Sequence, residues 1–153
     1  MMEMVRLLPY YYSQAKDEEE YIASGGNSSV ILLHSLNPRQ GEKELDPEPR
    51  HALIGHSLNV STLEYSIKRQ KLISGSWDKT ARIWSKSTSE EEDGQGWECE
   101  MVLEEHEEAV WGVLGIDSGP SDGCWLTSSG MCPHSLLRDT DGNSRPRDLP
   151  LEW

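Results

Sequence analysis

The chain has 153 residues, of which 27 are acidic and 14 are lysine or arginine, so its formal net charge is −13. Proteins that hold a phosphate backbone need clustered lysine and arginine, so this charge argues against a DNA or RNA partner. No run approaches the roughly 18 apolar residues of a membrane span, and no signal-peptide core is seen, so no membrane partner is expected. Three cysteines without a Cys-x-x-Cys pair suit a reducing compartment, which predicts a cytoplasmic and/or nuclear protein.

The first third of the chain predicts four short strands. They follow from the repeat, because Ile22 to His34 aligns with Leu72 to Trp84 at a shift of 50 residues. The segment between the third and fourth strand, 37–50, is rich in proline and charge and is predicted to be a loop. The four predicted strands are residues 4–11, 20–25, 30–35 and 51–54.

The middle third holds the clearest motif, a hairpin from Leu72 to Trp84 whose turn Asp78 can close with its own side chain. Gly55-His56 precedes this hairpin. Apolar side chains at four, seven and nine residues after His56 include a step of three within a period of two, which predicts a β-bulge in the strand. The predicted strands are residues 58–65, 71–76, 80–85 and 97–103.

The last third begins as a further copy of the same unit. His106 stands fifty residues after His56, and Trp125-Leu126-Thr127-Ser128-Ser129 repeats the Leu72 to Ser76 strand. Glu105 replaces the glycine expected before the histidine. After Ser129 the pattern stops, and residues 130–153 are polar and broken by three prolines. They are predicted to be an irregular tail, produced by truncation or a change of reading frame.

A Gly-His pair followed by a hairpin that ends in tryptophan resembles the WD-repeat family. Leu53 to His56, Leu72 to Trp84 and Ile22 to Asn27 are similar to the phospholipase A-2-activating protein family. The resemblance covers about residues 5–129 and implies an all-β, partial β-propeller of two to three four-stranded antiparallel blades. Because propellers usually have four to eight blades, the chain is expected to be a fragment. The expected blades are residues 4–54, 58–103 and 109–129.

Alternating strand direction places the His56 loop and the Asp78 turn at the same rim of a blade. Trp indole, Ser hydroxyl, His imidazole and Asp carboxylate can then form a chain of hydrogen bonds. The resemblance identifies this as the structural tetrad of a WD repeat, and it implies all four members only in the second unit: His56, Ser74, Asp78 and Trp84.

Two chemical alternatives use the same histidines. His56 and Ser74 could serve a hydrolase, but no Gly-x-Ser-x-Gly elbow is present, so no catalytic residue and no cofactor are expected. The acidic run around His106, residues 104–108, could hold a divalent metal, but adjacent carboxylates on an extended loop point apart. No metal site is expected.

The resemblance also implies that this rim binds a protein partner. WD-repeat proteins use the positions three and five residues after the histidine and the residue before the turn aspartate. For Trp77 and Trp111 two interpretations stay open, because indoles either anchor interfaces or fill gaps between blades. The candidate positions are Asn27, Asn59, Ser61, Trp77, Ala109 and Trp111.

The function that the resemblance implies is a non-catalytic scaffold that binds ubiquitin or ubiquitinated proteins, in ubiquitin-dependent protein catabolism and ubiquitin homeostasis. The domain with which that family docks a hexameric AAA unfoldase has no counterpart in this sequence, so no unfoldase partner is expected. Two alternatives remain: a WD-repeat adaptor with another protein ligand, and a truncated product without a function.

Overall fold

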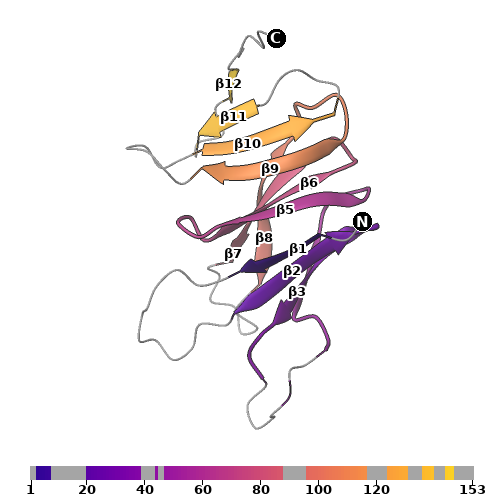
Figure 1. The fold of residues 1–153 in the computed structure, drawn as a ribbon, viewed down its shortest axis with the longest axis vertical. Coiled ribbons are helices and arrows are strands. Elements are labelled where there is room, and N and C mark those ends of the chain that lie inside the picture. The colour runs from indigo at the N-terminus through magenta and orange to yellow at the C-terminus, as the bar shows by residue number, and fades with distance from the viewer. Residues whose placement is uncertain are drawn as a thin grey trace.

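The computed structural model describes residues 3–7, 20–38, 44, 47–87, 96–116, 124–130, 136–139 and 144–146. These residues form three four-stranded sheets, and in each sheet consecutive strands pair with one another (Figure 1). The all-β expectation is confirmed. The described part of the chain forms no helix that is long and apolar enough to cross a membrane.

The first sheet, blade 1, is antiparallel throughout, with β1 at one edge and β4 at the other. Its side chains alternate: Ala23, Ile31 and Leu33 are fully buried, whereas their neighbours in sequence are only half-buried. One face of the blade therefore belongs to the core. The strands are β1 (Glu3–Leu7), β2 (Tyr21–Gly26), β3 (Ser28–Ser35) and β4 (His51–Ile54).

The second sheet, blade 2, has strands within two residues of the bounds predicted from the sequence. The predicted bulge is present in its first strand: Val60 pairs with Ser76 and Thr62 with Gly75, so Ser61 is the extra residue. The strands are β5 (Val60–Ser66), β6 (Lys71–Ser76), β7 (Ala81–Lys86) and β8 (Trp97–Leu103).

The third sheet, blade 3, includes two strands from the segment that was expected to be an irregular tail. The apolar pair Leu136-Leu137 lies on β11, which pairs with the open edge of β10. Pro146 ends β12, the outer edge strand, which is a place in a sheet where proline is tolerated. The rest of 131–153 lies outside the described residues. The strands are β9 (Val110–Ile116), β10 (Cys124–Ser129), β11 (Leu136–Asp139) and β12 (Ser144–Pro146).

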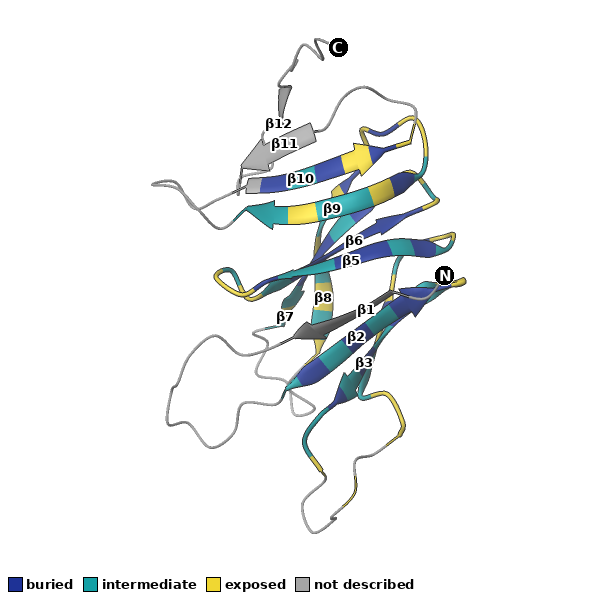
Figure 2. Ribbon diagram, viewed as in Figure 1, coloured by how far each residue is buried: buried dark blue, intermediate teal, exposed yellow. Residues whose placement is uncertain are grey.

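The core lies between the blades, and blade 2 contributes to it from both faces (Figure 2). Leu72 and Trp84 pack against blade 1, while Ile73 and Ile83 pack with Trp125 of blade 3. The first strand of each following blade lies against the first and second strands of the blade before it.

Two glycines show how close this approach is. A Cβ added to Gly25 would lie 2.8 Å from Val60, and one added to Gly75 would lie 2.7 Å from Val110. No side chain fits at either position without displacing a branched neighbour. The same contact thus recurs at both blade boundaries.

Candidate functional site: the rim around His56

The four predicted tetrad residues meet in one chain of hydrogen bonds. Trp84 on β7 donates its indole N–H to the Ser74 hydroxyl at 2.8 Å. The Ser74 oxygen lies 2.7 Å from Nε2 of His56, and Nδ1 of His56 lies 2.9 Å from Oδ2 of Asp78. The chain runs from the middle of the sheet to the rim, so it ties the β4–β5 loop to the β6–β7 turn.

Burial determines the protonation state of this chain. Burial lowers the pKa of His56 below its usual 6.5, and the neighbouring Asp78 only partly opposes that effect. The Ser74 oxygen already accepts the indole proton, so its own proton goes to Nε2 of His56. Nδ1–H of the neutral imidazole then donates to Asp78. Each polar hydrogen of the tetrad has an acceptor.

Asp78 is the anchor at the rim. Burial alone would raise its pKa, but the Thr80 hydroxyl, the amides of Ser57 and Thr80, and His56 all bond to the carboxylate and lower its pKa to about 2. The hydroxyl of Thr80 lies 2.7 Å from Oδ1 and the amide of Ser57 lies 2.9 Å from Oδ2. Thr80 had no role in the sequence analysis, although its place two residues after a turn aspartate is a usual signal for such a bond.

Blade 3 contains a shorter version of the same arrangement. Nε2 of His106 lies 2.7 Å from the Thr127 hydroxyl, and both side chains are buried. Thr127 occupies the place of Ser74 in the repeat, so the alignment of the two β-strands could have identified it. Residues 130–152 contain no tryptophan that could take the place of Trp84.

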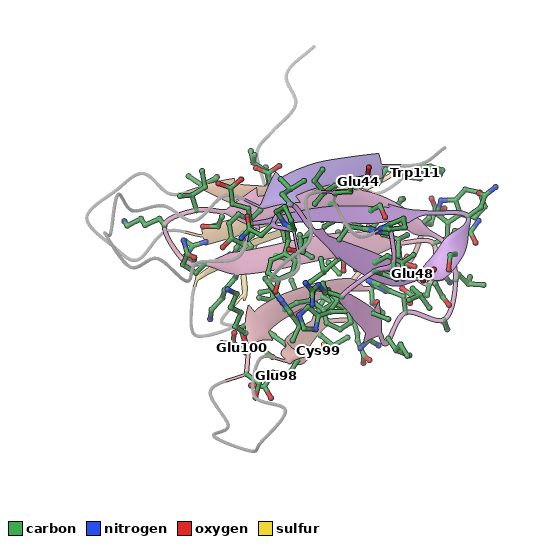
Figure 3. All side chains as sticks on the ribbon, turned by 90° about the horizontal axis from the view of Figure 1, so that it is seen from below. Glu44, Glu48, Glu98, Cys99, Glu100 and Trp111 are labelled. Atoms are coloured by element: carbon green, nitrogen blue, oxygen red, sulfur yellow. The ribbon has the colours of Figure 1, made fainter. Side chains whose placement is uncertain are left out.

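The two rim tryptophans contact each other across the boundary between blades 2 and 3. Their ring centroids lie 5.7 Å apart, yet 45% of Trp77 and 56% of Trp111 remain exposed. Trp77 lies in the β6–β7 turn, and Trp111 is the extra residue of a bulge in β9, at the edge of the ribbon in Figure 3. The rings therefore bridge adjacent blades and also face solvent, and their role in binding a partner stays a prediction.

The asparagines continue this surface toward blade 1. Nδ2 of Asn59 donates to Oδ1 of Asn27 at 3.3 Å, and the Trp77 amide donates to the Asn59 carbonyl at 3.0 Å. We call Asn27, Asn59, Trp77 and Trp111 the rim strip. It crosses all three blades.

The remaining rim candidates lie differently. Ala109 is half-buried, and the Ser61 hydroxyl donates to the Val110 carbonyl of the next blade, so its proton is used within the protein. Leu58, in the same loop as Asn59, is 52% exposed. Sequence reasoning missed Leu58 because an apolar residue in a loop carries no signal of its own.

The chemical alternatives do not fit this geometry. Ser74 is fully buried and its hydroxyl is held between His56 and Trp84, so no substrate could reach it as a nucleophile. Within the described ranges, which include the acidic run 104–108, no group of three or more His, Cys, Asp or Glu side chains could hold a metal ion.

Comparison with known families gives one match. Residues 47–85 match the family described as "WD domain, G-beta repeat". This stretch runs from before β4 to β7 and contains all four tetrad residues.

The chain is similar to several curated proteins over part of its length. It is 35% identical over 92 residues, 60% of the chain, to "Phospholipase A-2-activating protein" of Xenopus laevis. It is 38% identical over 71 residues, 46% of the chain, to "Protein DOA1" of Saccharomyces cerevisiae. It is 30% identical over 70 residues, 46% of the chain, to "Ubiquitin homeostasis protein lub1" of Schizosaccharomyces pombe. The matches cover only 9%, 9% and 8% of those relatives.

Among solved structures, a chain from "Crystal Structure of Mitotic Checkpoint Complex" superposes with a TM-score of 0.63 over 81% of this chain and 33% of that one. The sequence identity of 21% makes this a likeness of fold alone. The matched part of this chain thus corresponds to one third of that larger chain.

Proposed function

We propose that this chain, which has a WD repeat over residues 47–85 and a partial β-propeller fold, is a scaffold whose rim strip binds ubiquitin or ubiquitinated proteins. The exposed pair Trp77 and Trp111 carries this proposal. Large aromatic side chains with one face in solvent are the residues that most often anchor protein interfaces.

The tetrad supports this role by holding the strip rigid. Trp77 directly precedes Asp78, whose carboxylate is bonded to His56, Ser57 and Thr80. The amide of Trp77 is itself bonded to Asn59. A side chain that is already fixed in its bound position loses little freedom on binding, so more of its contact energy contributes to affinity.

Ubiquitin is the proposed ligand because of the similarities in sequence. One relative is named for ubiquitin homeostasis, and the motifs around His56 and Leu72 resemble the ubiquitin-binding phospholipase A-2-activating family. The proposed process is ubiquitin-dependent protein catabolism, and the proposed location is the cytoplasm and/or the nucleus.

Titration of isotope-labelled ubiquitin with the chain, followed by NMR, tests this function. We expect shift changes on one ubiquitin surface, and a loss of affinity of about tenfold for Trp77→Ala or Trp111→Ala, because hot-spot truncations cost more than about 1 kcal/mol. The matched control is Ile67→Ala, an exposed apolar residue in the β5–β6 turn, which lies at the other end of the blade. Unchanged ubiquitin spectra, or equal affinities for all variants, would remove ubiquitin as the ligand of the rim strip.

A WD-repeat adaptor with another protein ligand is the second candidate. The family match over residues 47–85 favours it, because that match concerns the repeat and carries no ligand. Proteins captured by the wild-type chain and lost with both tryptophan variants, in the absence of ubiquitin binding, would identify this case.

A further inference from the structure

Two indoles lie together on the rim strip without a cation of their own. The rings of Trp77 and Trp111 contact each other, and each remains about half exposed. Among the described residues, no lysine or arginine lies over either ring. The face of an indole is the negative part of its quadrupole, so it attracts a cation placed above it. The pair is therefore an open place for a positive charge.

The other end of the same blade boundary shows such a place filled. Arg69, in the β5–β6 turn of blade 2, lies with its guanidinium carbon 4.5 Å from the ring centre of Trp125 of blade 3. The same guanidinium donates to the Ile116 carbonyl at 3.4 Å. Where blades 2 and 3 meet away from the rim, the chain thus covers an indole with its own arginine. At the rim it leaves the indoles uncovered.

Carboxylates stand beside the exposed pair. Glu107 and Glu108, in the β8–β9 loop, are exposed, and neither pairs with a described lysine or arginine. A Cβ added to Gly130 would lie 3.0 Å from Nε1 of Trp111 and 4.0 Å from Oε2 of Glu108. The indole and this carboxylate therefore border the same point, which glycine leaves empty. A cation that rests on the indoles has a carboxylate within reach of its N–H groups.

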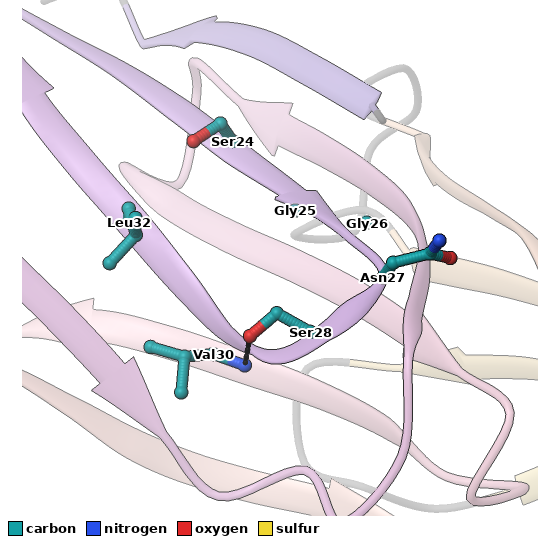
Figure 4. A pocket seen from close by; sticks show the side chains of 7 residues that line it. All are labelled: Ser24, Gly25, Gly26, Asn27, Ser28, Val30 and Leu32. Atoms are coloured by element: carbon teal, nitrogen blue, oxygen red, sulfur yellow. Dashed lines mark hydrogen bonds between the residues drawn. The ribbon is translucent and has the colours of Figure 1, made fainter. Parts of the chain in front are cut away.

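The charge of the rim strip is concentrated at this end. At the blade 1 end, Figure 4 shows Asn27 at the β2–β3 turn, beside a hollow of about 370 Å³. None of the residues that line this hollow is charged, namely Ser24 to Ser28, Val30 and Leu32. At the blade 3 end the loop of residues 104–108 carries four glutamates, whereas Lys79 is the exposed lysine of the β6–β7 turn. The strip is thus neutral on blade 1 and negative on blade 3.

We propose that the rim strip recognises a lysine or arginine side chain on the surface of a protein partner, with the cation on the Trp77–Trp111 pair and its N–H groups directed at Glu107 and Glu108. This inference rests on the rim strip being a binding surface, as proposed above, but not on ubiquitin being its ligand. The formal charge of −13 favours the approach of a positively charged surface and repels an acidic one.

Magnetic resonance of the isotope-labelled chain tests this recognition. The probes are capped peptides, Gly-Ser-Xaa-Ser-Gly, with lysine, arginine, norleucine or glutamate in the centre. Trp77→Phe and Trp111→Phe assign two of the six indole N–H signals. We expect the lysine and arginine peptides to shift these two signals and the glutamate peptide to leave them in place. Norleucine has the length of lysine without its charge, so its peptide should bind about two- to fivefold more weakly. Added salt should weaken the binding of the cationic peptides alone.

Two double variants locate the charge that is needed. Glu107→Gln with Glu108→Gln should weaken binding of the lysine peptide about threefold, since exposed ion pairs contribute modestly. The matched control, Glu98→Gln with Glu100→Gln, removes the same charge from exposed positions of β8, which lie well apart from Trp111 in Figure 3, and should leave the affinity unchanged. Far-UV circular dichroism checks the fold of each variant.

The outcomes separate this inference from the proposed function. Equal binding of the lysine and norleucine peptides, or equal losses for the two double variants, would overturn it, because the strip would then recognise apolar groups or the overall charge. Signals of Trp77 and Trp111 that no peptide moves would overturn it too, and bound ubiquitin would leave the proposed function in place. Shifts caused by the lysine peptide together with unchanged ubiquitin spectra would support the inference and remove ubiquitin as the ligand.

Discussion

Blades 2 and 3 have the same strand order but differ in what holds their rims. In blade 2 four side chains, from Trp84 to Asp78, connect the middle of the sheet to the turn. In blade 3 the corresponding histidine, His106, is bonded to the Thr127 hydroxyl. Blade 2 is also buried on both faces, whereas Leu114 of blade 3 is 46% exposed on the face turned away from blade 2.

The two blades show that the residues of a WD-repeat tetrad have two separate structural roles. The His to Ser or Thr bond fixes the loop that leads into a blade, and blade 3 retains it. The indole and the carboxylate extend that fixation to the sheet and to the turn. We expect blade 2 to be the most stable part of the chain. Trp125 of blade 3 packs against it.

The largest effect should come from Trp84→Ala. Its buried indole fills the core between blades 1 and 2, and its loss leaves a cavity and an unpaired Ser74 oxygen. We expect a cost of about 3–5 kcal/mol in the free energy of unfolding, measured by urea denaturation with circular dichroism. Trp77→Ala is the matched control at the surface, with an expected change of about 0.5 kcal/mol or less. Equal losses for both would show that blade 2 is not the most stable part of the chain, and a chain without a cooperative transition would favour the truncated-product alternative.

A smaller effect should be the difference between Ser74→Ala and Thr127→Val in the loss of unfolding free energy. Removing the Ser74 hydroxyl leaves both His56 and Trp84 with an unsatisfied buried nitrogen, at a cost of about 2 kcal/mol for the two together. Thr127→Val keeps the shape of the side chain and breaks one bond to His106, so it should cost less. The same urea experiment gives both values. A larger loss of stability for Thr127→Val would show that the histidine bond contributes more in blade 3 than in blade 2.

The smallest effect should be the dependence of stability on pH. The pKa of His56 is lower in the folded than in the unfolded chain, so its contribution is complete above pH 6.5 and is lost as the pH falls below that value. Asp78 contributes in a second step, lost as the pH falls from 3.8 toward 2. His56→Gln should remove the first step from a series of urea midpoints against pH and leave the second. A variant whose midpoints still fall below pH 6.5 as in the wild type would assign that step to another histidine.

Most strands of blades 1 and 2 could be predicted, because the hairpin turn and the repeat indicate similar bounds. The tetrad could be predicted as well, since its members lie at fixed distances from one hairpin. Strands β11 and β12 could not, because they have four and three residues and lie in a segment rich in proline. A strand this short depends on the edge it pairs with, which the local sequence does not contain.

The contacts between blades could not be predicted from the sequence either. The meeting of Trp77 and Trp111 depends on how closely blade 3 approaches Gly75, and the bond from Ser61 to the Val110 carbonyl depends on the same approach. Periodicity predicts which face a side chain occupies, but it gives no distance between two sheets.

The bulge in the first strand of blades 2 and 3 provides a position whose side chain can vary while the pairing of the strands stays the same. Its extra residue stands outside the ladder of paired strands: it is serine in blade 2 and tryptophan in blade 3, in sheets of the same order. A hydroxyl and an indole are thus tolerated at one backbone position. At Trp111 a mutation can change which molecule is bound while the inter-strand bonds stay the same, so the chain can acquire a new ligand without first being restabilised. At Ser61 a mutation also removes the bond to the Val110 carbonyl of the next blade.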